Sequence, residues 1–341
     1  MTTVAVIVVA HGEAETSGFF DNFFMTRHTL AHASEVMAIS KPLQLFISVL
    51  SGLKNRSRFR KVNYASPQNE LTRKQAAALG NKLEQHQEKR VFAFEVLPAF
   101  SATPPFFEEI VGGTRHYDIQ IMLYMAPVEN SLNCGSVCSY LKENYAGHDL
   151  AAIRVISSFW RDRRFLDVYL DHIFQHVESG SRGDAGRRSL ILVFHGTLVA
   201  DAGGNDPSFH TGLEETVTFA GALRKTIMND RRNSFGQVHV SFLNHDVGGE
   251  WTAPSLEQTL NGLKKENAEH VALFTAGYFS EGNETLLKAK GALLQSGIAS
   301  VSYIPCINDS DAFIGYLSDR VVAAAKQVNR LNSEKGGSHG G

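Results

Sequence analysis

This chain has few cysteines, almost no net charge and no long hydrophobic run. Its 341 residues carry 33 basic and 35 acidic side chains, for a net charge of -2, and such a balance gives no electrostatic footprint for nucleic acid. The apolar run at residues 4–10 is too short to cross a bilayer and has no basic residue before it. We therefore predict a buried strand there, no signal peptide, and a cytoplasmic protein that does not bind nucleic acid.

The three cysteines, Cys134, Cys138 and Cys306, are too few and of the wrong parity for a disulfide framework. Cys134 and Cys138 are spaced to lie one helical turn apart, where they could hold a metal. Three thiols do not complete a four-cysteine iron–sulfur site. We expect reduced, partly buried thiols and no iron–sulfur cluster.

Short apolar runs alternate with amphipathic stretches along the chain. Examples of the amphipathic stretches are LTRKQAAALGNKLEQH and TVTFAGALRKTIM. This alternation is typical of α/β proteins in which parallel sheets are covered by helices on both faces, and the length favours two domains. The apolar runs are residues 4–10, 91–97, 119–125, 153–157, 190–194, 239–243, 270–275 and 300–304.

Two of these runs end in the same dipeptide, His-Gly. The first run leads into His11, and the run at 190–194 leads into His195. Ligands of open α/β sheets bind outside the carboxyl ends of the strands. Either histidine alone could merely cap its strand, but the pair favours a cleft shared by two similar domains.

The domain change is predicted near residues 147–151, ahead of the polar, glycine-rich loop at 180–188. The expected organisation is an N-terminal domain, a C-terminal domain, a long last helix that packs back on the first domain, and a disordered tail. These parts correspond to residues 1–150, 151–309, about 310–331 and 332–341.

Four segments after residue 194 follow one another in a specific order: HGTLVADAGGNDPSFHTGLEET, NHDVGGEWTAPSLEQTL, TAGYFSEGNETLLKAK and YIPCINDSDAFIGYL. In this order they resemble the ferrochelatase family, the type II tetrapyrrole chelatases. In the first half, SRFRKVNYASPQNELTRKQAAAL is similar to family segments as well, so that the resemblance covers nearly the whole chain. The matching positions are His195, Gly196, Asp206, Pro207, Gly248, Trp251, Pro254, Ser280, Glu284, Thr285, Leu286, Cys306, Asn308, Asp309, Ser310, Ser66, Pro67, Thr72, Gln75 and Ala76.

The resemblance implies two similar Rossmann-like domains with a porphyrin cleft between them. It implies a lyase of haem biosynthesis that inserts ferrous iron into protoporphyrin IX or coproporphyrin III. His195 matches the family's active-site histidine and Glu284 its partner glutamate, so both are candidates for catalysis and for metal binding. Ferrous iron is then a substrate, and no prosthetic group is expected.

The chemistry of metallation suits these two side chains. Two pyrrole protons must leave, for which imidazole is a base of suitable pKa. Imidazole and carboxylate can also bind ferrous iron without holding it as hard as thiolates would. A carboxylate beside an imidazole fixes its orientation and raises its basicity.

Further candidates for porphyrin contact lie mainly in the first half. An aromatic-rich stretch begins at Phe19, and it predicts either ordinary helix core or an apolar lip on a porphyrin site. The family places a mobile apolar lip here, so peripheral contact with a membrane through it is a further expectation. A guanidinium such as that of Arg58 could grip a propionate, although a solvated basic loop also fits. The porphyrin-contact candidates are His11, Phe19, Phe23, Arg58, Ser66, Pro67 and Trp251.

The largest departure from the family is a pair of lysines, Lys288 and Lys290, where acidic residues usually continue along the helix. A lysine four residues after Glu284 would favour its ionised form and repel an incoming cation. The lysines favour one alternative, a paralogue that binds porphyrin or haem without metallating it. A cobalt or nickel chelatase for another tetrapyrrole is a second, separate alternative. The oligomeric state, monomer or homodimer, is left open too.

Overall fold

The computed structural model describes residues 1–36, 39–177, 188–245 and 248–337, with side chains placed up to residue 331. The chain forms two compact units. The first unit comprises Met1–Met125, Ser131–Ser157 and Asp309–Gly341, and the second comprises Ala126–Asn130 and Ser158–Asn308.

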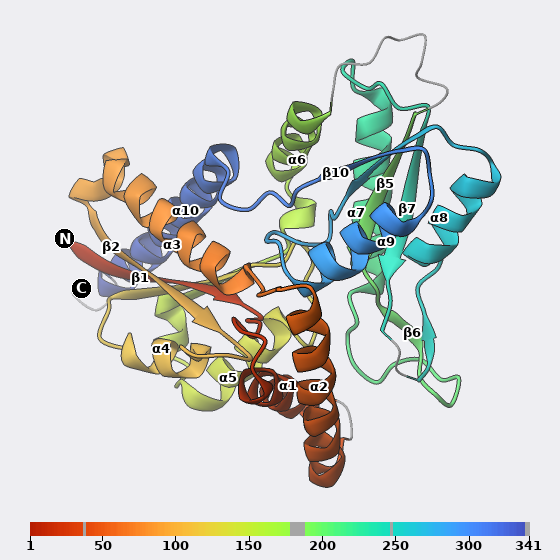
Figure 1. Cartoon of the computed structure of the whole chain (residues 1–341). Coiled ribbons are helices and arrows are strands. Elements are labelled where there is room, and N and C mark those ends of the chain that lie inside the picture. The colour runs from red at the N-terminus through yellow and green to blue at the C-terminus, as the bar shows by residue number, and fades with distance from the viewer. Residues whose placement is uncertain (37–38, 178–187, 246–247, 338–341) are drawn as a thin grey trace. The chain divides into compact units, whose positions relative to one another are not determined.

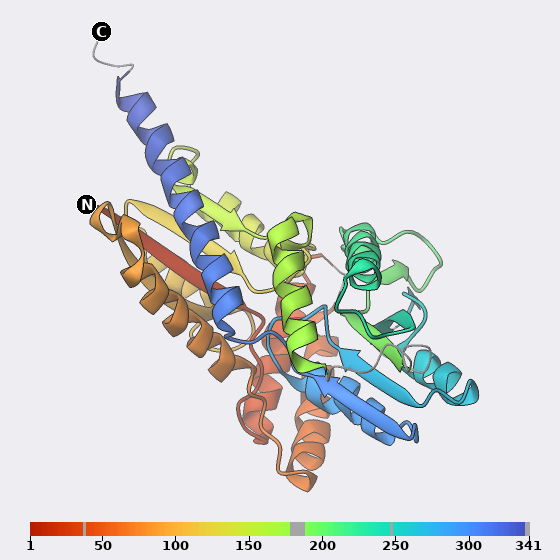
Figure 2. The same cartoon turned by 90° about the horizontal axis from the view of Figure 1, so that it is seen from above.

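A four-stranded parallel sheet of order β2-β1-β3-β4 forms the centre of the first unit. Its strand β1 is buried from Val4 to Ala10, which explains the unbroken apolar run, because helices cover both faces of the sheet. Helices α3 and α10 lie along one face, and α4 and α5 lie beyond the other (Figures 1 and 2). The strands are β1 (Thr2–Ala10), β2 (Phe92–Phe100), β3 (Ile119–Tyr124) and β4 (Ile153–Ile156).

Two long helices, α1 and α2, follow strand β1 and pack against each other. A hydrogen bond of 2.8 Å between the hydroxyls of Thr26 and Ser51 joins them. The helices of the first unit are α1 (Phe19–Ala33), α2 (Lys41–Lys61), α3 (Gln68–Gln85), α4 (Phe107–Gly113), α5 (Cys134–Asn144) and α10 (Asp311–Gly337), with short 3-10 turns η1 (Gln87–Arg90) and η2 (Asp149–Ala152).

The second unit is built on another parallel sheet, of order β10-β9-β5-β7. Its strands are β5 (Arg188–His195), β7 (Gln237–Leu243), β9 (His270–Phe274) and β10 (Ser300–Ile304), with a small antiparallel pair β6 (Leu198–Ala200) and β8 (Glu250–Trp251). The helical segments are η3 (Phe159–Arg161), α6 (Arg163–His176), α7 (Leu213–Asn229), α8 (Leu256–Lys265), the π-helical segment η5 (Asn283–Lys290) and α9 (Gly291–Gln295).

Successive residues of strand β5 belong to different cores because side chains alternate across a strand. Ile191 and Val193 pack into a cluster that includes Leu260 of α8. Phe194 points to the other face, where its ring meets Phe219 of α7 at 5.5 Å between centroids. The sheet is thus covered by apolar packing on both faces, and polar side chains that could bind a ligand lie at the ends of its strands.

The predicted fold class is confirmed, since each unit is a parallel sheet flanked by helices and all eight apolar runs contain strands. The division lies at residue 158 and not at 150, because β4 pairs with β3 of the first unit. Helix α10 contacts α3, β3 and β4 and continues to Gly337, into the stretch expected to be a disordered tail. Most of the loop expected at 180–188 lies outside the described residues.

Within the part of the chain that the structure describes, every helix is too short or too polar to span a lipid bilayer.

Candidate metal and active site

Three adjacent strands of the second unit deliver three side chains to one edge of the sheet. His195 is the last residue of β5, His245 follows β7 by two residues, and Glu284 lies in segment η5, which comes after β9. Strand β5 is hydrogen-bonded to β9 on one side and to β7 on the other. Because the three strands are parallel, their carboxyl ends meet at the same edge, where α/β folds bind ligands.

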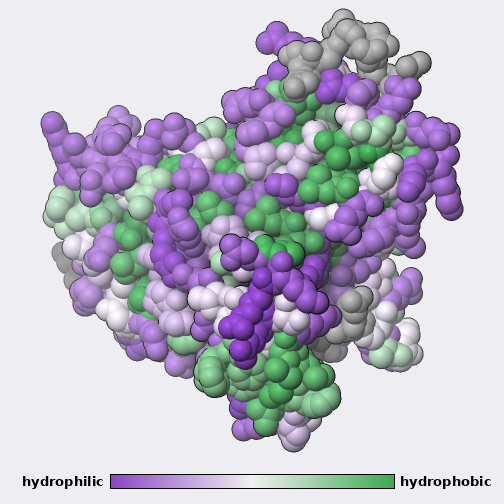
Figure 3. Space-filling view, in the orientation of Figure 1, coloured by the Kyte–Doolittle hydropathy of each residue, from purple (hydrophilic) through white to green (hydrophobic). Residues whose placement is uncertain are grey.

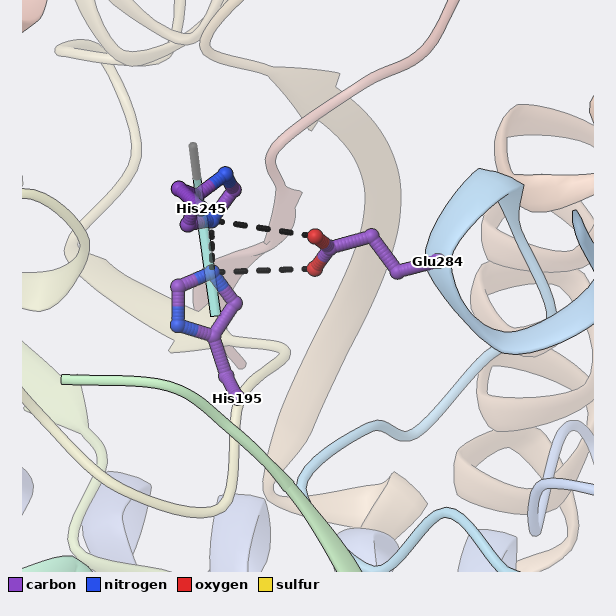
Figure 4. A group of neighbouring side chains, drawn as sticks. All are labelled: His195, His245 and Glu284. Carbon is purple, nitrogen blue, oxygen red and sulfur yellow. Dashed lines mark hydrogen bonds and ion pairs between the residues drawn. The ribbon is translucent and has the colours of Figure 1, made fainter. Parts of the chain in front are cut away.

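The three side chains form one compact cluster (Figure 4). The Nε2 atoms of His195 and His245 lie 3.0 Å apart. Nε2 of His195 is 3.6 Å from Oε2 of Glu284, and Nε2 of His245 is 3.7 Å from Oε1. The predicted proximity of His195 and Glu284 is what the structure shows, and His245 adds a third donor of the kind that binds divalent transition metals.

Glycines on two sides of His195 let the backbone segments approach closely. A Cβ atom on Gly196 would lie 2.7 Å from the carbonyl oxygen of Leu243 in β7, and one on Gly277 would lie 2.7 Å from the amide nitrogen of His195. Any larger residue at either position would push these segments apart. The glycine of the His-Gly dipeptide is therefore explained by packing beside β7.

The imidazole of His195 is held in one tautomer. Its Nδ1 lies 2.7 Å from the carbonyl oxygen of Gly196, and a carbonyl can only accept, so Nδ1 carries the proton and donates it. In the neutral ring, Nε2 then keeps its lone pair and faces the cluster. This backbone contact is the kind that orients metal-binding and proton-accepting histidines.

The Glu284 carboxylate is oriented by two further partners. The hydroxyl of Tyr278 donates to Oε2 over 2.7 Å, and the ammonium of Lys288 donates to Oε1 over 2.9 Å. Burial acts to raise the pKa of Glu284, but the charges of His195, Lys288 and His245 outweigh it and lower the pKa to about 2. Glu284 is therefore an anion throughout the neutral range, as the lysine four residues later predicted.

A second glutamate, Glu281, fixes the start of the π-helical segment. It is buried, and its carboxylate accepts hydrogen bonds from the Thr285 hydroxyl at 2.6 Å, the Tyr303 hydroxyl at 2.9 Å and the Cys306 amide at 2.8 Å. These bonds tie the segment to the end of β10. Glu281 therefore determines where the backbone of Glu284 lies.

Sequence reasoning missed His245, although it lies inside a segment that matches the family. The available signal was its place directly after an apolar run that ends at 243. That signal becomes specific only when β7 is known to neighbour β5. Trp251, a predicted porphyrin contact, has the centre of its ring 5.4 Å from that of His245. It therefore lies beside the cluster, next to His245.

Three predicted site residues of the first unit, His11, Ser66 and Pro67, lie near the end of β1. His11 is exposed, with its Nε2 3.3 Å from the Thr29 hydroxyl of α1. Ser66 is buried and donates its hydroxyl to the carboxylate of Glu13, while Pro67 precedes the first turn of α3. Ser66 thus joins the approach to α3 to the loop that carries His11.

Helices α1 and α2 expose an apolar surface, so the aromatic-rich stretch is not all helix core, and a lip on a porphyrin site stays a prediction. Phe19 and Phe23 are partly buried and stack at 5.8 Å, whereas their neighbours point to solvent, and Figure 3 shows the resulting patch. Arg58 is exposed in the last turn of α2. Within α1 and α2 the most exposed apolar side chains are Phe20 (68%), Phe46 (59%), Phe24 (54%), Leu53 (53%) and Leu50 (50%).

The cysteines lie outside the His195 cluster. Cys134 and Cys138 are one turn apart in α5, the first buried and the second exposed, and a hydrogen bond from Cys134 lowers the pKa of the Cys138 thiol to about 7. Cys306 is buried, and burial raises its pKa. None of the described residues joins these thiols into a group of three or more metal donors.

Comparison with known proteins matches the chain to a family. The family described as Ferrochelatase matches residues 3–325. The chain belongs to the ferrochelatase family. A ferrochelatase of Neisseria meningitidis is 26% identical over 180 residues, which cover 52% of this chain and 49% of that protein. A ferrochelatase of Picosynechococcus sp. is 25% identical over 308 residues, covering 86% of this chain and 74% of that protein.

The alignment thus spans about half the length of the Neisseria ferrochelatase, and more of the cyanobacterial one. Among solved structures, a multi-domain protein of Deinococcus radiodurans, described as structurally similar to chelatases, superposes with a TM-score of 0.48 at 13% identity, covering 95% of this chain and 55% of that one.

Proposed function

We propose that this member of the ferrochelatase family is a lyase that inserts ferrous iron into a porphyrin, protoporphyrin IX or coproporphyrin III, in haem biosynthesis. The observation that carries the proposal is the convergence of His195 and Glu284, at 3.6 Å, from segments 89 positions apart in the chain. The cluster supplies what metallation needs, namely a base for the pyrrole protons and donors for a divalent cation.

The residues of the cluster divide the chemistry between them. Nε2 of His195 has the lone pair that accepts a pyrrole proton, since Nδ1 is committed to Gly196. Glu284 is an anion held in place by Tyr278 and Lys288. Its charge attracts the cation and stabilises the imidazolium that forms when His195 is protonated. Each porphyrin gains one divalent cation and loses two protons, which His195, 46% exposed, passes to solvent one after the other.

The apolar surface of α1 and α2 supports a role in holding the flat, apolar porphyrin ring. In this proposal Phe19, Phe23 and Trp251 contact the ring and Arg58 pairs with a propionate. His11 approaches the ring at the end of β1, on the loop that Ser66 and Pro67 help to hold.

Peripheral contact with a membrane through the same surface is part of the proposal. Sedimentation with anionic phospholipid vesicles tests it: wild type should co-sediment, and Leu50→Asp should not if this surface makes the contact. The oligomeric state and the cytoplasmic location stay predictions from the sequence.

The function is tested by anaerobic incubation of the full chain with each porphyrin and with ferrous, cobalt or nickel ions, followed by absorbance. Wild type should form metalloporphyrin most rapidly with ferrous iron. His195→Ala should abolish insertion and still quench porphyrin fluorescence on binding, because one imidazole contributes little to apolar burial. His270→Ala, which changes a histidine at the opposite end of the sheet, is the control.

A non-catalytic porphyrin or haem binder is the second candidate, favoured by the Lys288 ammonium on Glu284. Porphyrin binding by wild type without any metallation would support it and overturn the lyase proposal. Preferential insertion of cobalt or nickel would instead identify the other chelatase.

A further inference from the structure

The cluster contains one donor more than the proposed pair of His195 and Glu284. His245 reaches it from the end of β7, and its Nε2 lies 3.0 Å from that of His195 and 3.7 Å from Oε1 of Glu284. It is 37% exposed, so neither burial nor core packing accounts for its position.

The spacing of the three donors fits a single cation. With metal–ligand bonds of about 2.0 to 2.2 Å, two ligand atoms on one metal lie about 2.9 to 3.5 Å apart. The two Nε2 atoms lie 3.0 Å apart, and each lies 3.6 or 3.7 Å from a different oxygen of Glu284. With one donor atom taken from each residue, all three atoms lie within 4.8 Å of one another, so small side-chain movements would bring all three residues onto one ion.

The donors are also oriented from outside the cluster. His195 donates Nδ1–H to the Gly196 carbonyl, which turns Nε2 inward. Glu284 accepts from Tyr278 on Oε2, and the ring of Trp251 lies beside that of His245. Outer contacts of this kind typically orient the side chains that bind a metal. Without a shared ion, they would give little reason for the two imidazoles to face each other.

A cation already lies at the carboxylate. The ammonium of Lys288 is 2.9 Å from Oε1 of Glu284, the oxygen that faces His245. The site therefore attracts positive charge, and a divalent ion would have to compete with this ammonium.

We propose that His245 is a third protein ligand, so that His195, His245 and Glu284 hold one divalent first-row transition metal ion before any porphyrin is present. Two imidazoles and one carboxylate suit iron, cobalt, nickel and zinc, whereas magnesium and calcium prefer oxygen donors alone. This inference deepens the proposed function and rests on it only for the fate of the ion, which is transfer to the porphyrin. Once the ion has left, Nε2 of His195 is free to accept a pyrrole proton.

The test is a cobalt(II) titration of the full chain without porphyrin, followed by ligand-field absorbance, which is strong only when several protein ligands replace water. Wild type should bind one ion, and a large excess of magnesium should not displace it. His245→Ala and His245→Gln should weaken binding at least about tenfold and reduce the band. His270→Ala should match wild type, and circular dichroism checks that each variant is folded.

An unchanged affinity and spectrum in both His245 variants would overturn the inference, and so would the absence of site-specific binding by wild type. The insertion assay gives an independent answer. Cobalt binding that depends on His245 without porphyrin metallation would retain the inference and defeat the proposed function. If the His245 variants still metallate porphyrin and bind cobalt as wild type does, the proposed function is retained and the inference is defeated.

Discussion

The Nζ atom of Lys288 lies 2.9 Å from Oε1 of Glu284, within the same π-helical segment. Lys290, two residues on, instead places its ammonium 5.3 Å from the centre of the Tyr303 ring. Of the two lysines that stand where the family usually carries acidic residues, one therefore contacts Glu284 of the candidate site and the other contacts an aromatic ring.

Removal of the Lys288 charge should strengthen binding of a divalent cation. In Lys288→Met, zinc affinity measured by calorimetry should rise roughly two- to fivefold, because a partly exposed ion pair is worth about 0.5 to 1 kcal/mol. Lys290→Met removes the same charge from the same segment without touching Glu284, and its affinity should stay near that of wild type. Weaker zinc binding by Lys288→Met would mean that the lysine orients the carboxylate and does not compete with the metal.

Loss of the Glu281 charge should destabilise the second unit. Glu281→Gln puts an amide where the carboxylate accepts three hydrogen bonds, and the free energy of unfolding should fall by about 2 to 3 kcal/mol. Urea denaturation measures this. Glu257→Gln, at an exposed glutamate in the first turn of α8, should change stability by less than about 0.5 kcal/mol. Equal stability of the two variants would show that Glu281 does not anchor the π-helical segment.

Acid should destabilise the protein partly through His172. Its ring is buried, with Nε2 2.8 Å from the carbonyl oxygen of Pro305, and burial lowers its pKa below 6.5. The unfolded chain therefore takes up the proton first, so that stability falls as the pH drops below about 6.5, at no more than about 1.4 kcal/mol per pH unit for one proton. Urea denaturation at several pH values should show a shallower decline for His172→Gln than for wild type, and parallel curves would contradict the assignment.

Cys138 should react as a thiolate near neutral pH. Its pKa is lowered to about 7 by a hydrogen bond from Cys134, and its side chain is exposed. The rate of iodoacetamide labelling, followed by mass spectrometry, should rise with a midpoint near pH 7 in wild type and nearer pH 8.5 in Cys134→Ala. Cys306, buried in the same molecule, should stay unlabelled. The same midpoint in wild type and Cys134→Ala would rule out the hydrogen bond from Cys134 as the cause of the lowered pKa.

The sequence alone was enough to predict the strands and, from them, the fold class. Apolar runs such as 190–194 identify strands covered on both faces, because only such strands need hydrophobic residues at every position. The order of the motifs pointed to His195 and Glu284. The spacing of Glu284 and Lys288 also predicted their contact, because both lie in one helical segment and the interaction is local.

Only the tertiary structure decided which distant residues meet. His245 was not predicted, since its role depends on β7 lying beside β5, and neighbouring strands in a parallel sheet are joined by long connections that leave no local signal. The same holds for β4, which pairs with β3 and so belongs to the first unit. The exposure of Phe20 and Leu50 likewise depended on which faces of α1 and α2 found a partner, because an apolar stripe reads alike whether it is buried in a core or open to a ligand.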